Sequence, residues 1–139
     1  MADTLTCEIV TPVKTVFSST ATYVGLPGEM GSFGVMQRHE PLVSALKPGA
    51  VHVTVSGEGK TNKVNFVISG GYAEIADNKV IVLANDALAV GEIEVPAVKA
   101  ELEKVNQVIA GLKADDSSAA YYKSQKAWFE LQLKAASGE

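Results

Sequence analysis

Short runs of alternating apolar and polar residues fill the first 90 positions of the chain, a pattern typical of β-strands. In Ala50–Ser56, three valines fall on one face and His52 and Thr54 fall on the other. The neighbouring runs are rich in β-branched residues and are separated by turn-forming residues. The predicted strands are Leu5–Thr11, Val13–Ser18, Thr20–Leu26, Ala50–Ser56, Lys63–Ser69, Gly71–Ala76 and Lys79–Ala84.

The connections between these runs indicate how the strands are joined. Asp77-Asn78 predicts a two-residue hairpin turn, because both residue types tolerate the left-handed backbone. Thr-Pro and Ser-Ser pairs separate the first three strands. Glycines at every third position from 25 to 34 predict a loop and a short strand with close backbone approach. Many short strands without intervening helices favour an antiparallel sandwich or barrel.

Beyond Gly91 the apolar period changes to that of helices. Apolar residues recur at spacings of 4, 3, 4 and 3, which predicts one helix with a single apolar stripe. Pro96 falls where a first helical turn tolerates proline. Asp115, Asp116, Ser117 and Ser118 end this helix and cap the next one. The stripe consists of Val98, Leu102, Val105, Ile109 and Leu112.

The second predicted helix carries Tyr121, Ser124, Trp128 and Leu131 on one face, with three further apolar residues beside it. Two amphipathic helices with a short joint form an antiparallel hairpin. We therefore expect a β-sandwich domain over residues 1–90, followed by a helical hairpin domain over residues 91–139.

Composition restricts the class of protein. The chain has 139 residues, 47% hydrophobic and 20% charged, which is enough apolar material for a real core. A net charge of -4 argues against a nucleic-acid binder. No apolar run is long enough for a membrane span, and no signal peptide is expected at the start. Cys7, the only cysteine, is interpreted as a small core residue.

Few residues are candidates for catalysis, metal binding or phosphate binding. His39 and His52 lie in different elements with no second ligand at metal-binding spacing, so we expect no metal and no catalytic role. His39 is either a loop hydrogen-bonder or an interface residue. Gly59-Lys60-Thr61 resembles the end of a phosphate-binding loop, but Thr54 stands where that motif needs glycine and the stretch joins two strands. The residues alone therefore predict a non-enzymatic interaction subunit without a cofactor.

Charge differs between the two helices. Lys123, Lys126 and Lys134 make the second helix basic, whereas four glutamates make the first acidic. Two interpretations stay open: solvated faces that match the helix dipoles, or a docking surface for an acidic partner.

A stretch of nineteen residues, Gly31–Gly49, resembles the epsilon subunit of bacterial rotary ATP synthases, called delta in mitochondria. That family shows a glycine–acid–apolar–glycine turn, then Pro-Gly-His-Ala-Pro-Leu and a segment ending in Lys-Pro-Gly. Ser69–Ile75 and Val80–Ala84 resemble its Ser-Gly-Gly stretch and the strand that follows, and Val16-Phe17-Ser18 also fits. The resemblance covers the whole chain in order.

The resemblance implies a ten-stranded β-sandwich and two helices, within the central rotor. It implies that the sandwich binds the gamma subunit and the ring of membrane c subunits, at the cytoplasmic face of the bacterial inner membrane, and couples proton-driven rotation to ATP synthesis. The interface residues expected from it are Glu29, Gly31, Ser32, Phe33, Gly34, Arg38 and His39.

The resemblance also implies a regulatory hairpin that extends along gamma into the catalytic alpha/beta head and inhibits ATP hydrolysis. We expect its contacts at Lys123, Lys126, Trp128 and Lys134. A different class of function remains as the alternative, a free-standing small-molecule binding sandwich with a helical lid.

The chain departs from the family pattern at three places. Ser32 stands where many relatives have an acid that faces the c ring, and Glu29 is a possible substitute. Gln37-Arg38 replaces Pro-Gly, which makes that loop less rigid and more basic. Some relatives bind ATP through an Ile/Leu-Asp-x-x-Arg-Ala pattern, but Ile93–Val98 lacks the aspartate, the arginine and the final alanine, which argues against nucleotide binding.

Overall fold

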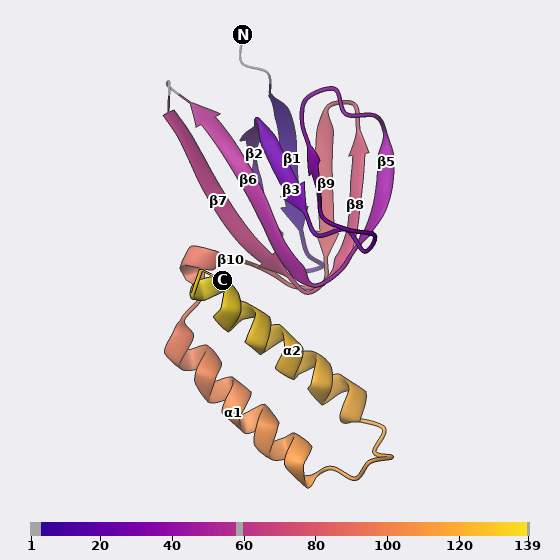
Figure 1. Cartoon of the computed structure of the whole chain (residues 1–139), viewed down its shortest axis with the longest axis vertical. Helices are drawn as coiled ribbons and strands as arrows, with labels where there is room; N and C mark the ends of the chain where they lie inside the picture. The colour runs from indigo at the N-terminus through magenta and orange to yellow at the C-terminus, as the bar shows by residue number, and fades with distance from the viewer. Residues whose placement is uncertain (1–3, 58–59, 139) are drawn as a thin grey trace. The chain divides into compact units, whose positions relative to one another are not determined.

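The protein is described by a computed structural model that covers residues 4–57 and 60–138. The chain divides into two units, Met1–Ala89 and Val90–Glu139. Within the described residues, the first unit holds ten strands, and the second holds a short 3₁₀ helix, Val90–Glu92, and two α-helices (Figure 1).

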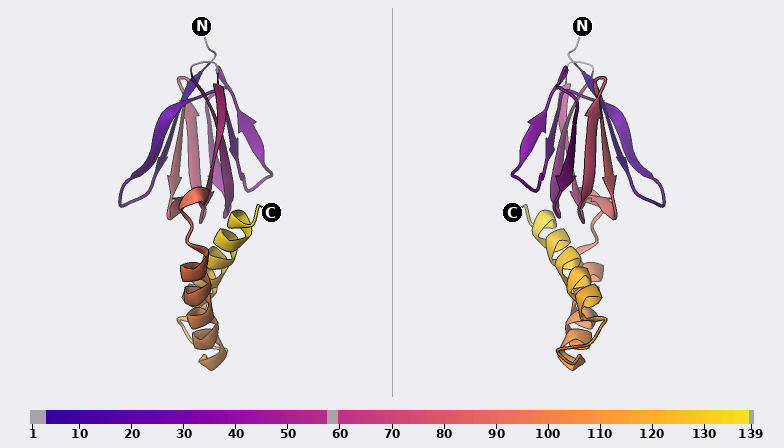
Figure 2. Two further views of the ribbon diagram at one scale, coloured as in Figure 1. Left: turned by 90° about the vertical axis from the view of Figure 1, so that its left-hand side faces the viewer. Right: turned by 90° about the vertical axis from the view of Figure 1, so that its right-hand side faces the viewer.

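The ten strands form two five-stranded sheets that face each other (Figure 2). Sheet A contains, in spatial order, β2 (Thr15–Ala21), β1 (Leu5–Val10), β9 (Lys79–Ala84), β8 (Gly71–Ala76) and β5 (Leu42–Leu46). Sheet B contains β10 (Ala87–Ala89), β7 (Lys60–Ile68), β6 (Gly49–Gly57), β3 (Tyr23–Leu26) and β4 (Phe33–Val35). The predicted β-sandwich is therefore confirmed.

The core lies between the sheets and is built from alternate residues of most strands. Cys7 and Ile9 of β1 and Val51 and Val53 of β6 are fully buried, because every second side chain of a strand points to the same face. Phe66 of β7 joins this core and stacks at a tilt on a Phe17 ring 5.0 Å away. Cys7 is thus a core residue, as expected.

The structure corrects two strand-level predictions. The break predicted at Ser18-Ser19 falls instead at Thr22, so β2 continues to Ala21 and pairs with β1 along its length. An all-antiparallel arrangement was also wrong, because β1 and β9 pair in parallel. A parallel neighbour places the N-terminal strand inside sheet A, between β2 and β9.

Two predicted connections between strands can be compared with the structure. Asp77 and Asn78 both have positive φ, 50° and 62°, and join β8 to β9 as predicted. β6 and β7 pair up to Gly57 and Lys60, so the segment that resembles a phosphate-binding loop joins two paired strands. Gly59 itself lies outside the described residues.

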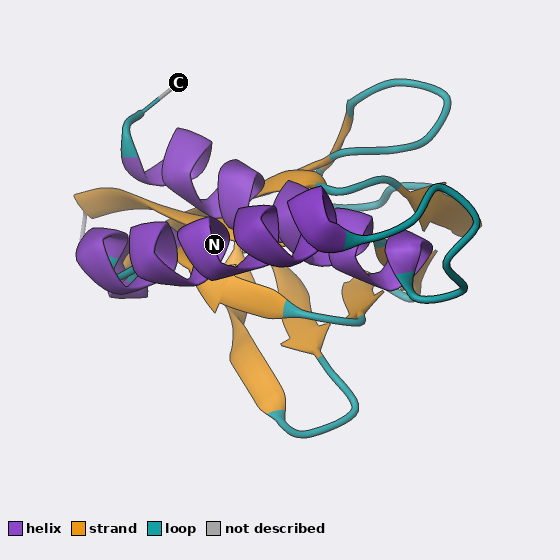
Figure 3. Ribbon diagram, turned by 90° about the horizontal axis from the view of Figure 1, so that it is seen from below, coloured by secondary structure: helices purple, strands orange, loops and turns teal. Residues whose placement is uncertain are grey.

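The second unit is the predicted helical hairpin, in which α1 (Val95–Gly111) and α2 (Ala119–Ala136) run antiparallel side by side (Figure 3). Pro96 lies in the first turn of α1. The apolar stripe from Val98 to Leu112 is confirmed, because all five of its residues are buried or half-buried.

Ser118, from the predicted acidic cluster, is the N-cap residue of α2, but its side chain makes no capping hydrogen bond to the helix. The Asp116 carboxylate accepts hydrogen bonds from the backbone N–H and the hydroxyl of Ser118, the N-cap residue. These bonds stabilise the ionised form and hold the pKa of Asp116 below its usual value.

The inner face of α2 agrees with the predicted one only in part. Trp128 and Leu131 are half-buried, but Tyr121 and Ser124 are exposed. Tyr122 and Phe129 are half-buried and Gln132 is buried. The helical period could not decide between the two faces, because Tyr121 and Tyr122 are adjacent, as are Trp128 and Phe129, and either member of each pair fits an apolar stripe.

Candidate functional site

The loop between β3 and β4 carries three of the predicted interface residues. Backbone hydrogen bonds to β5 fix the base of this loop. Gly28 forms a bridge with Leu46, and the Glu29 N–H donates to the Ala45 carbonyl oxygen at 3.0 Å. Gly31 has a φ of 128°, a value that favours glycine. The tip residues Glu29, Met30, Gly31 and Ser32 are all exposed. A fixed base with an exposed tip suits contact with another molecule.

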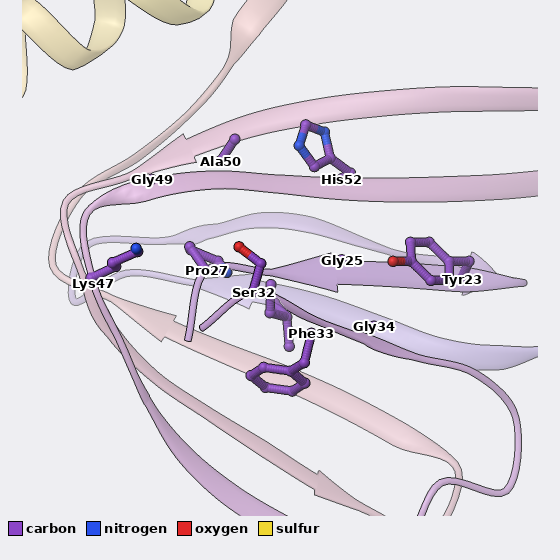
Figure 4. A pocket seen from close by; sticks show the side chains of 11 residues that line it. Tyr23, Gly25, Pro27, Ser32, Phe33, Gly34, Lys47, Gly49, Ala50 and His52 are labelled. Carbon is purple, nitrogen blue, oxygen red and sulfur yellow. The ribbon is translucent and has the colours of Figure 1, made fainter. Parts of the chain in front are cut away.

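Beside this loop, the outer face of sheet B is hollowed (Figure 4). A row of paired residues runs across four strands: Asn65, His52, Gly25 and Gly34. The Tyr23 side chain lies over the two glycines, because a Cβ atom placed on Gly34 would come within 2.5 Å of its ring. The depression measures about 400 Å³, and Ser32, Phe33 and Gly34 also line it.

His52 is oriented within this depression. Its Nδ1 atom lies 2.8 Å from the Asn65 side-chain oxygen, a hydrogen-bonding distance. Lys47, Ser32 and the Tyr23 hydroxyl are further polar groups along the wall. Sequence reasoning considered His52 as a strand residue and as a metal ligand, and did not connect it with Ser32–Gly34.

Arg38 and His39 lie at the opposite end of the sandwich. They belong to a turn, closed by a hydrogen bond from the His39 N–H to the Met36 carbonyl oxygen, that contacts the β8–β9 turn at Asn78. The loop with Glu29 instead contacts the other end of β5, at Ala45 and Leu46 (Figure 1). The seven predicted interface residues therefore form two separate groups.

A third surface was missed by sequence reasoning, the outer face of sheet A. Paired positions on four adjacent strands place apolar side chains side by side, and we call this set the apolar row: Ala45, Tyr72, Leu83 and Val10. Tyr72 is 59% exposed and Leu83 48% exposed. Beside these two residues lies a largely apolar depression of about 430 Å³.

The next row of the same face is mixed. It places Val43, 69% exposed, beside Glu74, Ile81 and Glu8. The Lys79 ammonium lies 3.6 Å from a Glu8 carboxylate oxygen. Contiguous exposed apolar residues flanked by charges mark protein contact surfaces. The available signal was the near-continuous apolar run of Lys79–Ala84, which was interpreted only as a strand.

In the hairpin, Lys123 and Lys134 are exposed, while Lys126 and Trp128 are half-buried. The basic side of α2 is thus only partly open to solvent. Near the joint of the hairpin, a small depression of about 120 Å³ is lined by Ile109, Leu112, Lys113, Ala114, Ala119 and Lys123.

The side chains on these surfaces suit protein contacts better than catalysis or metal binding. Burial raises the pKa of the Cys7 thiol to about 12, with the Glu8 carboxylate adding to the effect, so this thiol is not a nucleophile. Across residues 4–57 and 60–138, no three His, Cys, Asp or Glu side chains gather as metal ligands do. None of the described helices combines the length and the hydropathy of a membrane-spanning segment.

Comparison with known proteins finds relatives along most of the chain. The family model of the ATP synthase delta/epsilon chain β-sandwich domain matches residues 4–90. The ATP synthase epsilon chain of Nitratidesulfovibrio vulgaris strain DP4 is 37% identical over 135 residues, which cover 96% of this chain and 98% of that one. The epsilon chain of Pelotomaculum thermopropionicum is 41% identical over 103 residues, 74% of each chain.

Two solved structures share the fold. A chain of the Euglena gracilis mitochondrial ATP synthase, solved as an OSCP/F1/c-ring assembly, matches with a TM-score of 0.72 and 23% identity over 98% of this chain and 82% of that one. A chain of the Tetrahymena thermophila mitochondrial ATP synthase, solved as central stalk and c-ring, matches with a TM-score of 0.64 and 22% identity over 94% and 95%. The resemblance drawn from the Gly31–Gly49 and Ser69–Ile75 motifs is confirmed, and the chain belongs to the delta/epsilon chain family of ATP synthases.

Proposed function

We propose that this chain is a non-catalytic central-stalk subunit that couples c-ring rotation, driven by protons, to ATP synthesis through gamma. The apolar row on sheet A is the observation that carries the proposal. Tyr72 and Leu83 lie side by side and exposed, and contiguous exposed apolar residues mark surfaces that another protein covers. The relatives named as ATP synthase epsilon chains support a partner within the ATP synthase, and we take gamma as that partner from the family resemblance.

Two partners need two surfaces, and the sandwich offers them. We assign the sheet A face and the Arg38-His39 turn to gamma, because Val43 connects them along β5. We assign the exposed loop tip from Glu29 to Ser32 to the c ring, in agreement with the resemblance. Glu29 then supplies the carboxylate that Ser32 lacks. The complex would lie at the cytoplasmic face of the bacterial inner membrane.

The hairpin has a regulatory role in this proposal. Lys123 and Lys134 are exposed and would contact acidic surface on the catalytic alpha/beta head when the hairpin extends. Each exposed ion pair contributes only about 0.2–1 kcal/mol, so such contacts bias the position of the hairpin without locking it. Residues 1–90 would carry the rotor contacts, and residues 91–139 the regulation.

The proposal is tested by binding of the purified chain to gamma. Tyr72→Ser and Leu83→Ser should each weaken binding by about 30-fold, which is the roughly 2 kcal/mol of a buried hot-spot residue. Val13→Ser is the matched control, because Val13 is also exposed but lies in the β1–β2 turn, outside the apolar row. All three variants should fold as well as the parent, since the altered side chains are exposed.

A second arm separates the two partners. Glu29→Lys should leave binding to isolated gamma unchanged and weaken binding to a complex of gamma with the c ring. Failure of the parent chain to bind gamma, or equal binding by the Tyr72, Leu83 and Val13 variants, would overturn the assignment of the sheet A face.

A further inference from the structure

One side chain in the β8–β9 turn connects three segments that are distant in sequence. The Asn78 amide nitrogen donates to the Thr4 carbonyl oxygen at 2.8 Å, and the Asn78 amide oxygen accepts the Arg38 backbone N–H at 3.0 Å. The backbone carbonyl of Asn78 accepts a further bond from the Thr6 N–H. The start of β1, the β8–β9 turn and the turn at residues 36–39 therefore meet at this residue.

The turn at residues 36–39 has little preference of its own for the shape it adopts. Arg38 has a φ of 66° while Gln37 keeps a negative φ, and the His39 N–H donates to the Met36 carbonyl oxygen at 3.2 Å. This combination defines a type II turn, which favours proline at the second position and glycine at the third. Gln37-Arg38 supplies neither residue, and a left-handed conformation disfavours arginine. An external contact has to stabilise the turn.

Asparagine suits this role better than the alternatives. Asn78 has a φ of 62°, which asparagine and glycine tolerate well. Its amide offers both a donor for Thr4 and an acceptor for Arg38, whereas aspartate has no donor when ionised and glycine has no side chain. Asp77, with a φ of 50°, shares the turn and takes no part in these side-chain bonds.

We propose that Asn78 is a positioning residue for the gamma interface: its amide holds the 36–39 turn in the type II shape that presents Arg38 and His39. This inference rests on the proposed function, which assigns these two residues to gamma. Arg38 is exposed, and the turn leads into β5 next to the exposed Val43. Without the amide, the turn would sample other shapes, and binding would have to order it again.

The test is a comparison of Asn78→Gly in two backgrounds. Glycine keeps the left-handed turn and removes both side-chain bonds. In the parent chain, Asn78→Gly should weaken gamma binding by about fivefold and speed hydrogen exchange of the His39 amide by about tenfold, as expected for one lost hydrogen bond. Asp77→Gly, the matched control, should change neither quantity by more than about twofold.

The second background carries Gln37→Pro and Arg38→Gly, which give the turn its own type II preference. There, adding Asn78→Gly should change His39 exchange by less than about twofold. Gamma binding is not compared in this background, because Arg38→Gly removes a residue that the proposed function assigns to gamma. Circular dichroism melts accompany every variant, so that all comparisons are made well below unfolding.

Each result decides one claim. Equal effects of Asn78→Gly on His39 exchange in both backgrounds would show that the residue matters only through Thr4 and would overturn the inference. Unchanged His39 exchange in the parent background would do the same. If the parent chain does not bind gamma, the proposed function fails, and the exchange data still decide whether Asn78 positions the turn.

Discussion

Gly71 is the position at which a single methyl group should damage the sandwich most. Its φ is 152°, and a Cβ atom built on it would lie 2.0 Å from the Leu83 carbonyl oxygen and 2.9 Å from the Ala84 Cα atom. Both obstacles are backbone atoms of the paired strand β9, so no change of rotamer can relieve the contact. Gly71→Ala must therefore move β8 away from β9.

The loss of stability expected for Gly71→Ala is the sum of two contributions. The backbone strain of a non-glycine residue at such a φ is about 1–3 kcal/mol. Displacing the Gly71–Ala84 pair also weakens ladder hydrogen bonds, each worth about 1 kcal/mol. We expect a loss of about 3–5 kcal/mol, a large part of the roughly 5–15 kcal/mol that stabilise a domain.

Gly31→Ala is the matched control, because Gly31 also has positive φ, 128°, but a Cβ atom there would meet nothing within 4 Å. Gly31→Ala should lower the free energy of unfolding only by the cost of the backbone strain, about 1–2 kcal/mol. For a domain of this size, 1 kcal/mol lowers Tm by about 4–8 °C, so Gly71→Ala should lower it by at least about 12 °C.

The assay must report on the sandwich, because Trp128, the single tryptophan, lies in α2. Hydrogen exchange at the buried residues Ile75 and Val82 follows unfolding of sheet A directly. If Gly71→Ala lowers stability no more than Gly31→Ala does, the close approach of β8 and β9 is not the reason for glycine at position 71.

Three further predictions concern other parts of the chain. Burial raises the pKa of the Cys7 thiol from 9.0 to about 12, so the thiol of the unfolded chain loses its proton at lower pH than that of the folded chain. The free energy of unfolding should therefore fall by up to about 1.4 kcal/mol per pH unit between those two values. In urea unfolding, Cys7→Ala should lack this decrease of stability with pH. Millimolar ATP should leave the melting temperature of the isolated chain unchanged, because Ala97 replaces the arginine that would contact phosphate; a clear rise would contradict this. Replacing Lys123, Lys126 and Lys134 by glutamine should speed ATP hydrolysis by the whole complex at low salt, with a difference that shrinks as salt rises; equal rates at every salt concentration would mean that these lysines are only solvated.

The elements that could be predicted from the sequence are those defined by local chemistry. Gly71–Ala76 and Lys79–Ala84 match the structure residue for residue, because Asp77-Asn78 fixes where the hairpin reverses. The α1 stripe matches because its five residues recur at spacings of 3 and 4 that fit one face of a helix, with Val108 lying outside that face and 39% exposed. Three short strands, β4, β5 and β10, did not emerge from the alternation, since runs of three to five residues carry too few periods.

The missed features depend on contacts between distant segments. The parallel pairing of β1 with β9 joins residues more than 70 positions apart, and alternation within a strand says nothing about the direction of its neighbour. Glu29 and Arg38 are nine positions apart in the chain, yet they lie at opposite ends of the sandwich because β4 runs between them. Proximity in sequence therefore grouped residues that the structure separates.

The apolar row escaped prediction for a related reason. Both faces of β8 and β9 carry apolar residues, so the period of two could not show which face is the core. Pairing resolves the ambiguity, because Ala73 and Val82 are fully buried while Tyr72 and Leu83 are exposed.

The Ser69-Gly70-Gly71 motif, which carried part of the family resemblance, has a steric explanation that links it to the apolar row. The Ser69 hydroxyl accepts the Asp86 N–H at 2.9 Å, and Gly70, with a φ of 106°, lies against the Leu46 carbonyl oxygen. Gly71 then lets β8 approach β9 so closely that Tyr72 and Leu83 become neighbours on the outer face. A motif that contains no reactive group can thus be specific for a family, because it builds the surface on which a partner is proposed to bind.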